Sequence, residues 1–139
     1  MAPRNLPKLL NDPATTVALV GATDNATKYG ATIYRNLKAK GIPVFAVNPN
    51  RDTVDDDAAY ASLADLPQAP TIVNLVVPPR IGIGVLAEMA ELGYENVWFQ
   101  PGAESPAAVA LAEELGLNYL VDACTMVVGR DRPASSVSG

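Results

Sequence analysis

The fold is decided by residues 16–30, Thr16-Val17-Ala18-Leu19-Val20-Gly21-Ala22-Thr23-Asp24-Asn25-Ala26-Thr27-Lys28-Tyr29-Gly30. The apolar run Val17–Val20 is bounded by turn formers and is typical of a strand buried on both faces. Gly21 allows a sharp turn and a close approach of a ligand to the backbone. A helical pattern follows, and its first N–H groups would face the carboxyl end of the strand. This geometry suits a phosphate or pyrophosphate, although an ordinary strand-to-helix turn without a ligand is the alternative.

Four more short apolar segments predict further strands, at residues 43–47, 71–77, 96–99 and 118–121. Helical patterns lie between them at residues 28–40, 79–92 and 106–115, each closed by a glycine, Gly41, Gly93 or Gly116. Strands that alternate with helices require parallel pairing and right-handed crossovers. The sequence therefore predicts an α/β fold, a Rossmann-like, doubly wound, parallel five-stranded sheet with helices on both faces.

The segments outside this alternation are predicted to be minor elements. Residues 5–11 could make a short helical turn before Pro13 ends it. The acidic stretch Asp52–Asp57 is expected to be an exposed, solvated loop, and residues 60–67 to hold a short helix. The chain is predicted to be a single domain over residues 1–129, followed by an unfolded tail over residues 130–139.

Composition excludes several classes of function. The net charge of −5 argues against a general affinity for nucleic acid or anionic membranes. No apolar run approaches the roughly 20 residues that span a bilayer, and the N-terminus lacks the apolar segment of a signal peptide, so a cytoplasmic location is expected. Cys124 is the single cysteine and there is no histidine. That excludes an intramolecular disulfide framework, histidine-ligated metals and Ser-His or Cys-His catalysis.

The ligand site is predicted at the carboxyl ends of the strands, beside the first strand. The loops concerned are residues 21–30, 48–52, 77–81 and 100–104. A nicotinamide site would show G-x-G-x-x-G and an acid after the second strand. Here the first turn lacks the second and third glycines, and the second strand ends in Asn48-Pro49-Asn50-Arg51. Both departures count against NAD, whereas Arg51 could pair with a phosphate.

The chain resembles the small stand-alone CoA-binding domain proteins, which are similar to the N-terminal nucleotide domain of the succinyl-CoA synthetase alpha subunit. The resemblance runs from about Thr16 to Gly129. It is carried by segments in the right order: Val17-Ala18-Leu19-Val20-Gly21-Ala22-Thr23, Val44-Phe45-Ala46-Val47-Asn48-Pro49, Ser62-Leu63-Ala64-Asp65-Leu66-Pro67, Val76-Val77-Pro78-Pro79, Val97-Trp98-Phe99-Gln100-Pro101-Gly102 and Cys124.

The resemblance implies a site for coenzyme A or an acyl-CoA, bound through its ADP half. Thr23, Asp24 and Asn25 would lie in the phosphate turn, and Arg51 falls where the synthetase has a lysine that contacts CoA. Lys28 is not implied by the resemblance, but it is included among the candidates because it lies in the first turn and could reach a phosphate. The candidate cofactor-binding residues are Gly21, Ala22, Thr23, Asp24, Asn25, Lys28, Tyr29, Asn48, Pro49, Arg51, Val77, Pro78, Pro79, Phe99, Gln100 and Pro101. Among them Asp24 would repel a pyrophosphate unless it turned away to cap the helix.

The leading functional hypothesis is a CoA-binding carrier, sensor or regulator without a catalytic centre. The synthetase carries its phosphorylated histidine in a second domain, so its ligase activity does not carry over to a chain without histidine. Cys124 is expected to be a small apolar filler, with thiol exchange with CoA as the alternative. Two other functions stay open: an NAD(P)-dependent oxidoreductase or acyl-CoA-transforming enzyme, and a ligand-free protein-interaction domain that forms a homodimer or binds an unknown partner.

Overall fold

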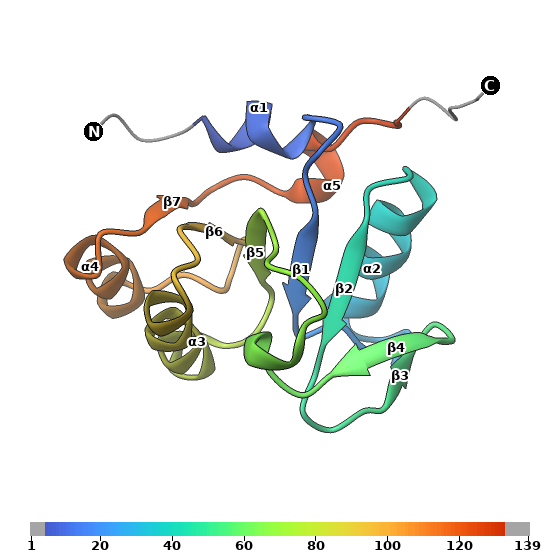
Figure 1. Cartoon of the computed structure of the whole chain (residues 1–139), viewed down its shortest axis with the longest axis horizontal. Coiled ribbons are helices and arrows are strands. Elements are labelled where there is room, and N and C mark those ends of the chain that lie inside the picture. Colours follow the sequence, from blue (N-terminus) through green and yellow to red (C-terminus); the bar gives the residue numbers. More distant parts are fainter. Residues whose placement is uncertain (1–4, 133–139) are drawn as a thin grey trace.

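The computed structural model describes residues 5–132. Its strands are β1 (Val17–Val20), β2 (Val44–Val47), β3 (Thr53–Val54), β4 (Asp57–Tyr60), β5 (Ile72–Leu75), β6 (Asn96–Phe99) and β7 (Asn118–Leu120). They form one sheet in the order β3-β4-β2-β1-β5-β6-β7, in which only β3 is antiparallel to its neighbour (Figure 1). Counted in chain order, the parallel strands read 3-2-1-4-5-6 across the sheet, the order of dinucleotide-binding folds. The predicted doubly wound fold is confirmed, and the winding reverses between β1 and β5.

Helices cover both faces of the sheet, as predicted. They are α1 (Leu6–Leu10), α2 (Tyr29–Ala39), the 3-10 helix η1 (Leu63–Asp65), α3 (Pro79–Leu92), α4 (Pro106–Glu114) and α5 (Thr125–Val128). Alternate side chains of β1 enter two separate cores: Leu19 packs with the α1 and α2 side, and Ala18 with the α3 and α4 side. Because β1 is buried on both faces, its four residues are all apolar. In Figure 1, α3 and α4 lie side by side, and α5 lies next to α1.

The five-strand count is wrong because residues 53–60 form an additional hairpin, β3 and β4. The expected exposed loop at Asp52–Asp57 is replaced by this hairpin, with a turn at Asp55 and Asp56, whose φ angles are 52° and 66°. Val54 is fully buried and fixes the hairpin to the core, while β4 extends the parallel sheet beside β2. The helix expected at residues 60–67 shrinks to η1 because Tyr60 continues the strand.

Both ends of the described segment are held together. The Arg132 guanidinium donates hydrogen bonds to the carbonyl oxygens of Asp12, Pro13 and Thr15 at 2.9–3.0 Å. The hydrogen-bonded structure thus extends past the predicted boundary at residue 129, and residues 133–139 of the predicted tail lie outside the described residues. Within residues 5–132, no helix is long and apolar enough to cross a membrane.

Candidate functional site

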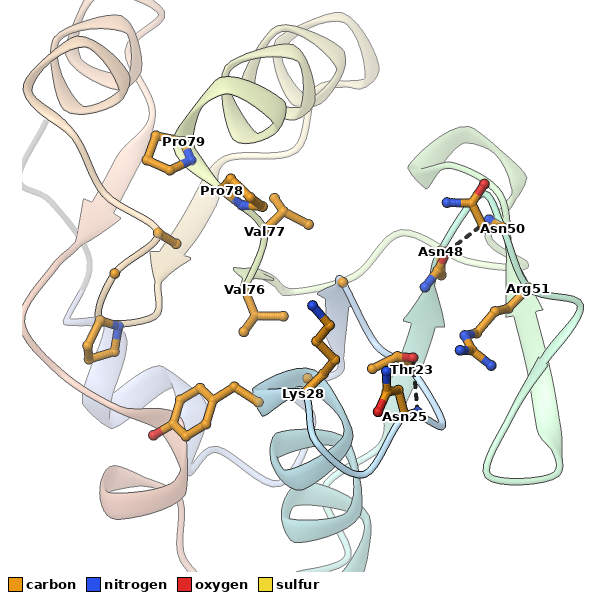
Figure 2. Close-up of a pocket in the computed structure, with 16 residues that line it drawn as sticks. Thr23, Asn25, Lys28, Asn48, Asn50, Arg51, Val76, Val77, Pro78 and Pro79 are labelled. Atoms are coloured by element: carbon orange, nitrogen blue, oxygen red, sulfur yellow. Dashed lines mark hydrogen bonds between the residues drawn. The ribbon is translucent and has the colours of Figure 1, made fainter.

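A cavity of about 760 Å³ lies at the carboxyl ends of β1, β2, β5 and β6 (Figure 2). Each of these strands contributes the segment that follows it, and the cavity therefore occupies the point where the winding of the sheet reverses. Small-molecule sites in proteins typically measure about 300–1,000 Å³. In doubly wound sheets, this reversal is where ligands bind.

Two glycines make the floor of the cavity. Gly21 has φ +104°, and a Cβ there would lie 2.7 Å from Cγ1 of Val76. A Cβ at Gly30 would lie 2.1 Å from the carbonyl oxygen of Gly21. Helix α2 therefore packs directly on the turn after β1, and only glycine allows this approach. Gly30 gives the close helix–strand packing expected of the third glycine of a dinucleotide motif, although it stands farther along the chain.

The loop between Gly21 and α2 is organised by its own side chains. Thr23 Oγ1 accepts from the amide of Asn25 at 3.1 Å, and Asn25 Oδ1 accepts from the amide of Thr27 at 3.0 Å. The amide of Lys28 donates to the carbonyl oxygen of Asn25 at 2.8 Å. Such side chain-to-backbone bonds favour a turn over a continued helix. Helix α2 consequently starts at Tyr29, one residue after Lys28.

Two helix N-termini border the cavity. Tyr29 and Gly30 open α2, Pro79 opens α3, and all three residues line the cavity. Neither helix has a side-chain hydrogen bond at its N-cap, which is Lys28 in α2 and Pro78 in α3. The first amides of a helix carry partial positive charge and attract anions. The cavity is thus placed to hold a negatively charged group.

Asn48 ties together the loops that follow β1 and β2. Its Nδ2 donates to the carbonyl oxygen of Ala22 at 2.9 Å, and its Oδ1 accepts from the amide of Asn50 at 2.8 Å. Asn48 and Asn50 both line the cavity, whereas Ala22 is fully buried and lies outside the lining. The amide side chain of Asn48 therefore fixes the spacing of the two loops before any ligand binds.

Among residues 5–132, the charged residues of the lining are Lys28 and Arg51, and none of the residues that line the cavity is acidic. Figure 2 shows Lys28 projecting into the space between the Val76–Val77 segment and Asn48. Within the described segment, no ion pair involves Lys28. The Nη1 atom of Arg51 lies 3.8 Å from Oδ2 of Asp24. The lining therefore offers positive charge from two side chains as well as from two helices.

Asp24 does not line the cavity, and it does not cap α2 as expected. Its Oδ1 accepts the backbone N–H of Asp55 in the β3–β4 turn, so it does not cap α2. The carboxylate is thereby tied to the β3–β4 turn.

Most of the sequence-predicted site residues come together in this cavity. Those that line it are Gly21, Thr23, Asn25, Lys28, Tyr29, Asn48, Arg51, Val77, Pro78, Pro79 and Pro101. Those that do not are Ala22, Asp24, Pro49, Phe99 and Gln100. The added lining residues are Gly30, Asn50, Val76, Gly102 and Ala103. All of the added residues except Val76 fall inside the loops that the sequence singled out. The sequence therefore indicated the correct loops, but these residues were not selected within them.

Phe99 and Gln100 are kept from the cavity by burial. Phe99 has no exposed surface and packs edge-on against Tyr119, with ring centroids 6.4 Å apart. Gln100 is also fully buried, and its Oε1 accepts from the amide and hydroxyl of Thr125 at 2.9 Å and 3.0 Å. Because Thr125, the first residue of α5, donates both hydrogen bonds, Gln100 serves to hold that helix.

Cys124, at the N-cap of α5, has polar contacts instead of acting only as an apolar filler. Gln100 Nε2 donates to its Sγ at 3.3 Å, and the hydroxyl of Tyr29 lies 3.7 Å from the same atom. Burial raises the pKa of the Cys124 thiol, but hydrogen bonds, led by that from Gln100, outweigh it and lower the pKa. The contact between the Tyr29 hydroxyl and Cys124 Sγ raises the pKa of Tyr29.

Comparison with known proteins gives one family and several relatives. The family model described as CoA binding domain matches residues 15–130. Over 83 residues, 58% of this chain, the sequence is 35% identical to an ADP-forming acetate–CoA ligase II of Archaeoglobus fulgidus, covering 12% of that protein. It is 30% identical over 82 residues, again 58% of this chain, to the alpha subunit of the Pyrococcus furiosus ADP-forming acetate–CoA ligase II, covering 18% of it. The chain thus spans less than a fifth of the length of these curated relatives.

A solved structure of similar size is a conserved hypothetical protein from Pyrococcus furiosus. The two chains share 41% sequence identity and superpose with a TM-score of 0.78. The alignment covers 81% of this chain and 97% of the other.

Proposed function

This chain belongs to the CoA binding domain family, and we propose that its cavity binds coenzyme A or an acyl-CoA through the ADP half of the molecule. The observation that carries the proposal is the charge of the cavity. Two helix N-termini and two cationic side chains, Lys28 and Arg51, border a space whose lining, in the part of the chain that the structure describes, includes no acid. Coenzyme A is a polyanion, and this arrangement favours such a ligand.

Each part of the cavity has a role in the proposal. The diphosphate would lie over Gly21, facing the first amides of α2, with Lys28 and Arg51 as its counter-ions. The apolar segment Val76–Pro79 would flank the adenine. The remaining lining at Tyr29 and residues 101–103 leaves room for the pantetheine arm.

The proposed role is that of a non-catalytic carrier, sensor or regulator. Among the described residues, the titratable side chains of the lining are Lys28, Tyr29 and Arg51, and they do not form a nucleophile–base pair with one another. The relatives are ligases, but the chain spans only 12–18% of their length. Binding of CoA is therefore proposed for this chain without the ligase reaction.

A second role is favoured by the relative that is an alpha subunit of a ligase. In this role the chain would supply the CoA site of an assembly whose catalytic parts lie on another chain. A homodimer, a protein partner and a cytoplasmic location stay predictions from the sequence. Native mass spectrometry of protein purified at its natural level would detect a stable heteromer, and a monomer or homodimer would count against the second role.

Calorimetric titration with CoA, acetyl-CoA, NAD and NADP tests the ligand. We expect saturable binding of CoA, acetyl-CoA or both, and no comparable signal with NAD, since the acid that would hold the NAD ribose is missing after β2. Clear binding of NAD with none of either CoA species would favour the oxidoreductase alternative. Failure of all four ligands would favour a protein-interaction domain.

A further inference from the structure

We propose that Asp24 competes with the phosphates of the bound nucleotide for Arg51, so that this carboxylate limits affinity and speeds release. The inference rests on the proposed function, because it assigns a role to a residue beside the proposed CoA cavity. It concerns a side chain that the sequence marked as unfavourable and that the structure places outside the lining.

The contact between the two side chains is loose and accessible. Arg51 Nη1 and Asp24 Oδ2 are 3.8 Å apart, and the Arg51 and Asp24 side chains are 37% and 39% exposed. Ion pairs with this exposure contribute little because solvent screens them. A phosphate offers a guanidinium two parallel hydrogen bonds and a higher charge. A ligand in the cavity can therefore take Arg51 from Asp24.

Asp24 is held in place by a second contact, so it does not move with Arg51. Its other oxygen, Oδ1, accepts the amide N–H of Asp55. The Asp55 carboxylate is in turn paired with Lys38 at 3.1 Å and with Arg35 at 3.7 Å on α2. The loop after β1 is thus fastened to the hairpin turn, and the hairpin turn to the helix. When a nucleotide binds, the long side chain of Arg51 is the part that has to move.

This arrangement makes the two cations of the cavity unequal. Lys28 has no ion-pair partner in residues 5–132, so its whole charge faces an incoming phosphate. Arg51 must break its ion pair with Asp24 to bind a phosphate, and the Asp24 carboxylate stays near the phosphate afterwards. The net gain from Arg51 is therefore smaller than its charge implies, as suits a ligand that is exchanged during function.

The substitution Asp24→Asn tests the proposal because asparagine keeps an Oδ1 acceptor for the Asp55 amide and replaces the charged oxygen near Arg51 by an uncharged NH2 group. By calorimetry, we expect CoA to bind about two- to fivefold more tightly, the range of a solvent-screened ion pair. In an Arg51→Gln background, the same substitution should change affinity by less than about 1.5-fold. Asp52→Asn is the matched control, since Asp52 has the same charge, neighbours Arg51 in sequence and has no ion pair in the described segment.

Each outcome supports or overturns a specific step. An unchanged melting temperature for Asp24→Asn shows that the loop is intact and makes the affinity comparison valid. If the melting temperature is lower, CoA dissociation rates are compared at a temperature at which both proteins are folded. Weaker CoA binding by Asp24→Asn would mean that Asp24 positions Arg51 for the ligand, which overturns the proposal. An equal gain in the Arg51→Gln background, or with Asp52→Asn, would mean general repulsion and also overturns it. If wild-type protein binds no CoA, the proposed function fails as well; if it binds CoA and Asp24→Asn is neutral, only this inference fails.

Discussion

Two charged clusters are joined by the hydrogen bond from the Asp55 amide to Asp24, and they differ in how their charges are balanced. The hairpin cluster joins α2 to the β3–β4 hairpin. Its Lys38 Nζ lies 2.8 Å from Asp57 Oδ2 and 3.1 Å from Asp55 Oδ2, and the Tyr34 hydroxyl donates to Asp57 at 2.7 Å. Its charges are therefore largely neutralised by one another.

The cavity cluster consists of Lys28, Arg51 and Asp24 and has the opposite balance. One cation has no ion-pair partner in the described part of the chain, and the other has a partner 3.8 Å away. The comparison teaches that charge alone does not mark a ligand site. Cations that are neutralised at bonding distance hold the fold together, whereas cations left open beside a cavity are available to a ligand.

The largest effect is expected from a change that would collapse the cavity floor. In Gly30→Ala, the new Cβ would meet the carbonyl oxygen of Gly21, which as backbone cannot rotate away. We expect a loss of about 3 kcal/mol in the free energy of unfolding, at the upper end for overpacking, measured in urea. Gly84→Ala is the control, because a Cβ at Gly84 in α3 meets no atom within 4 Å. It should be neutral or stabilise by up to about 1 kcal/mol, and equal losses in both variants would contradict the packing argument.

A smaller effect is expected from removing the open cation of the cavity cluster. Lys28→Gln should weaken CoA binding roughly tenfold, because one charge-assisted contact to a phosphate is lost, and should leave the melting temperature unchanged. Lys8→Gln, on α1 and outside the cavity lining, removes the same charge from a distant surface and should not change affinity. Calorimetry on both variants makes the comparison, and a similar loss in the two would show that only net charge matters.

The sequence predicted the parts of the fold that are continuous and apolar. The expected bounds of β1 and β6, Val17–Val20 and Asn96–Phe99, match the structure because both strands are buried on both faces. It missed the β3–β4 hairpin because the two strands are short and the turn between them, Asp55 and Asp56, is acidic. The carboxylates of Asp55 and Asp57 are paired with Lys38 of α2, which comes from a distant part of the chain.

The site was predictable at the level of loops and less so at the level of residues. Strand alternation alone indicated where the loops converge. Gly30 was not recognised as a packing glycine because the loop over residues 22–28 separates it from Gly21. Gln100 was expected to contact the ligand because the resemblance places it on a segment that contacts CoA in the synthetase. Its bonding to Thr125 was not foreseen, because the four-residue helix α5 leaves no periodic signal in the sequence.

The hairpin cluster should respond to pH and not to ligand. Hydrogen bonds from Lys38, and then from Tyr34, lower the pKa of Asp57 in the folded protein. A carboxyl group whose pKa is lowered by folding stabilises the folded protein at pH values above its ordinary, unfolded-state pKa. This stabilisation is lost as the pH falls through the lowered, folded-state pKa. Asp57→Asn should therefore lower the melting temperature by about 3 °C at pH 7, with the difference shrinking below about pH 4. The experiment is calorimetric melting over this pH range.

Asp56→Asn serves as the matched control for this prediction, since Asp56 lies in the same turn and has no ion pair within residues 5–132. It should melt like the wild type. CoA affinity should be the same in both variants. A pH-independent difference for Asp57→Asn would show that its carboxylate charge is not what stabilises the hairpin.

The smallest effect is expected at Cys124, beside the cavity residue Tyr29. Burial raises the pKa of the Cys124 thiol, and hydrogen bonds, first from Gln100 and to a lesser extent from Tyr29, more than offset it. Tyr29→Phe should raise this pKa slightly and slow alkylation of the thiol at pH 8 by less than about twofold. Tyr119→Phe removes a hydroxyl that bonds Glu113 instead and should not change the rate. Faster alkylation in Tyr29→Phe would show that the hydroxyl shields the sulfur.

The central claim is that the cavity beside β1 holds coenzyme A, and a crystal structure of the protein grown with excess CoA tests it most directly. We expect density for the diphosphate over Gly21, with Lys28 and Arg51 turned toward it and Asp24 still bonded to the amide of Asp55. An empty cavity, or CoA bound elsewhere on the surface while Arg51 stays with Asp24, would contradict the account.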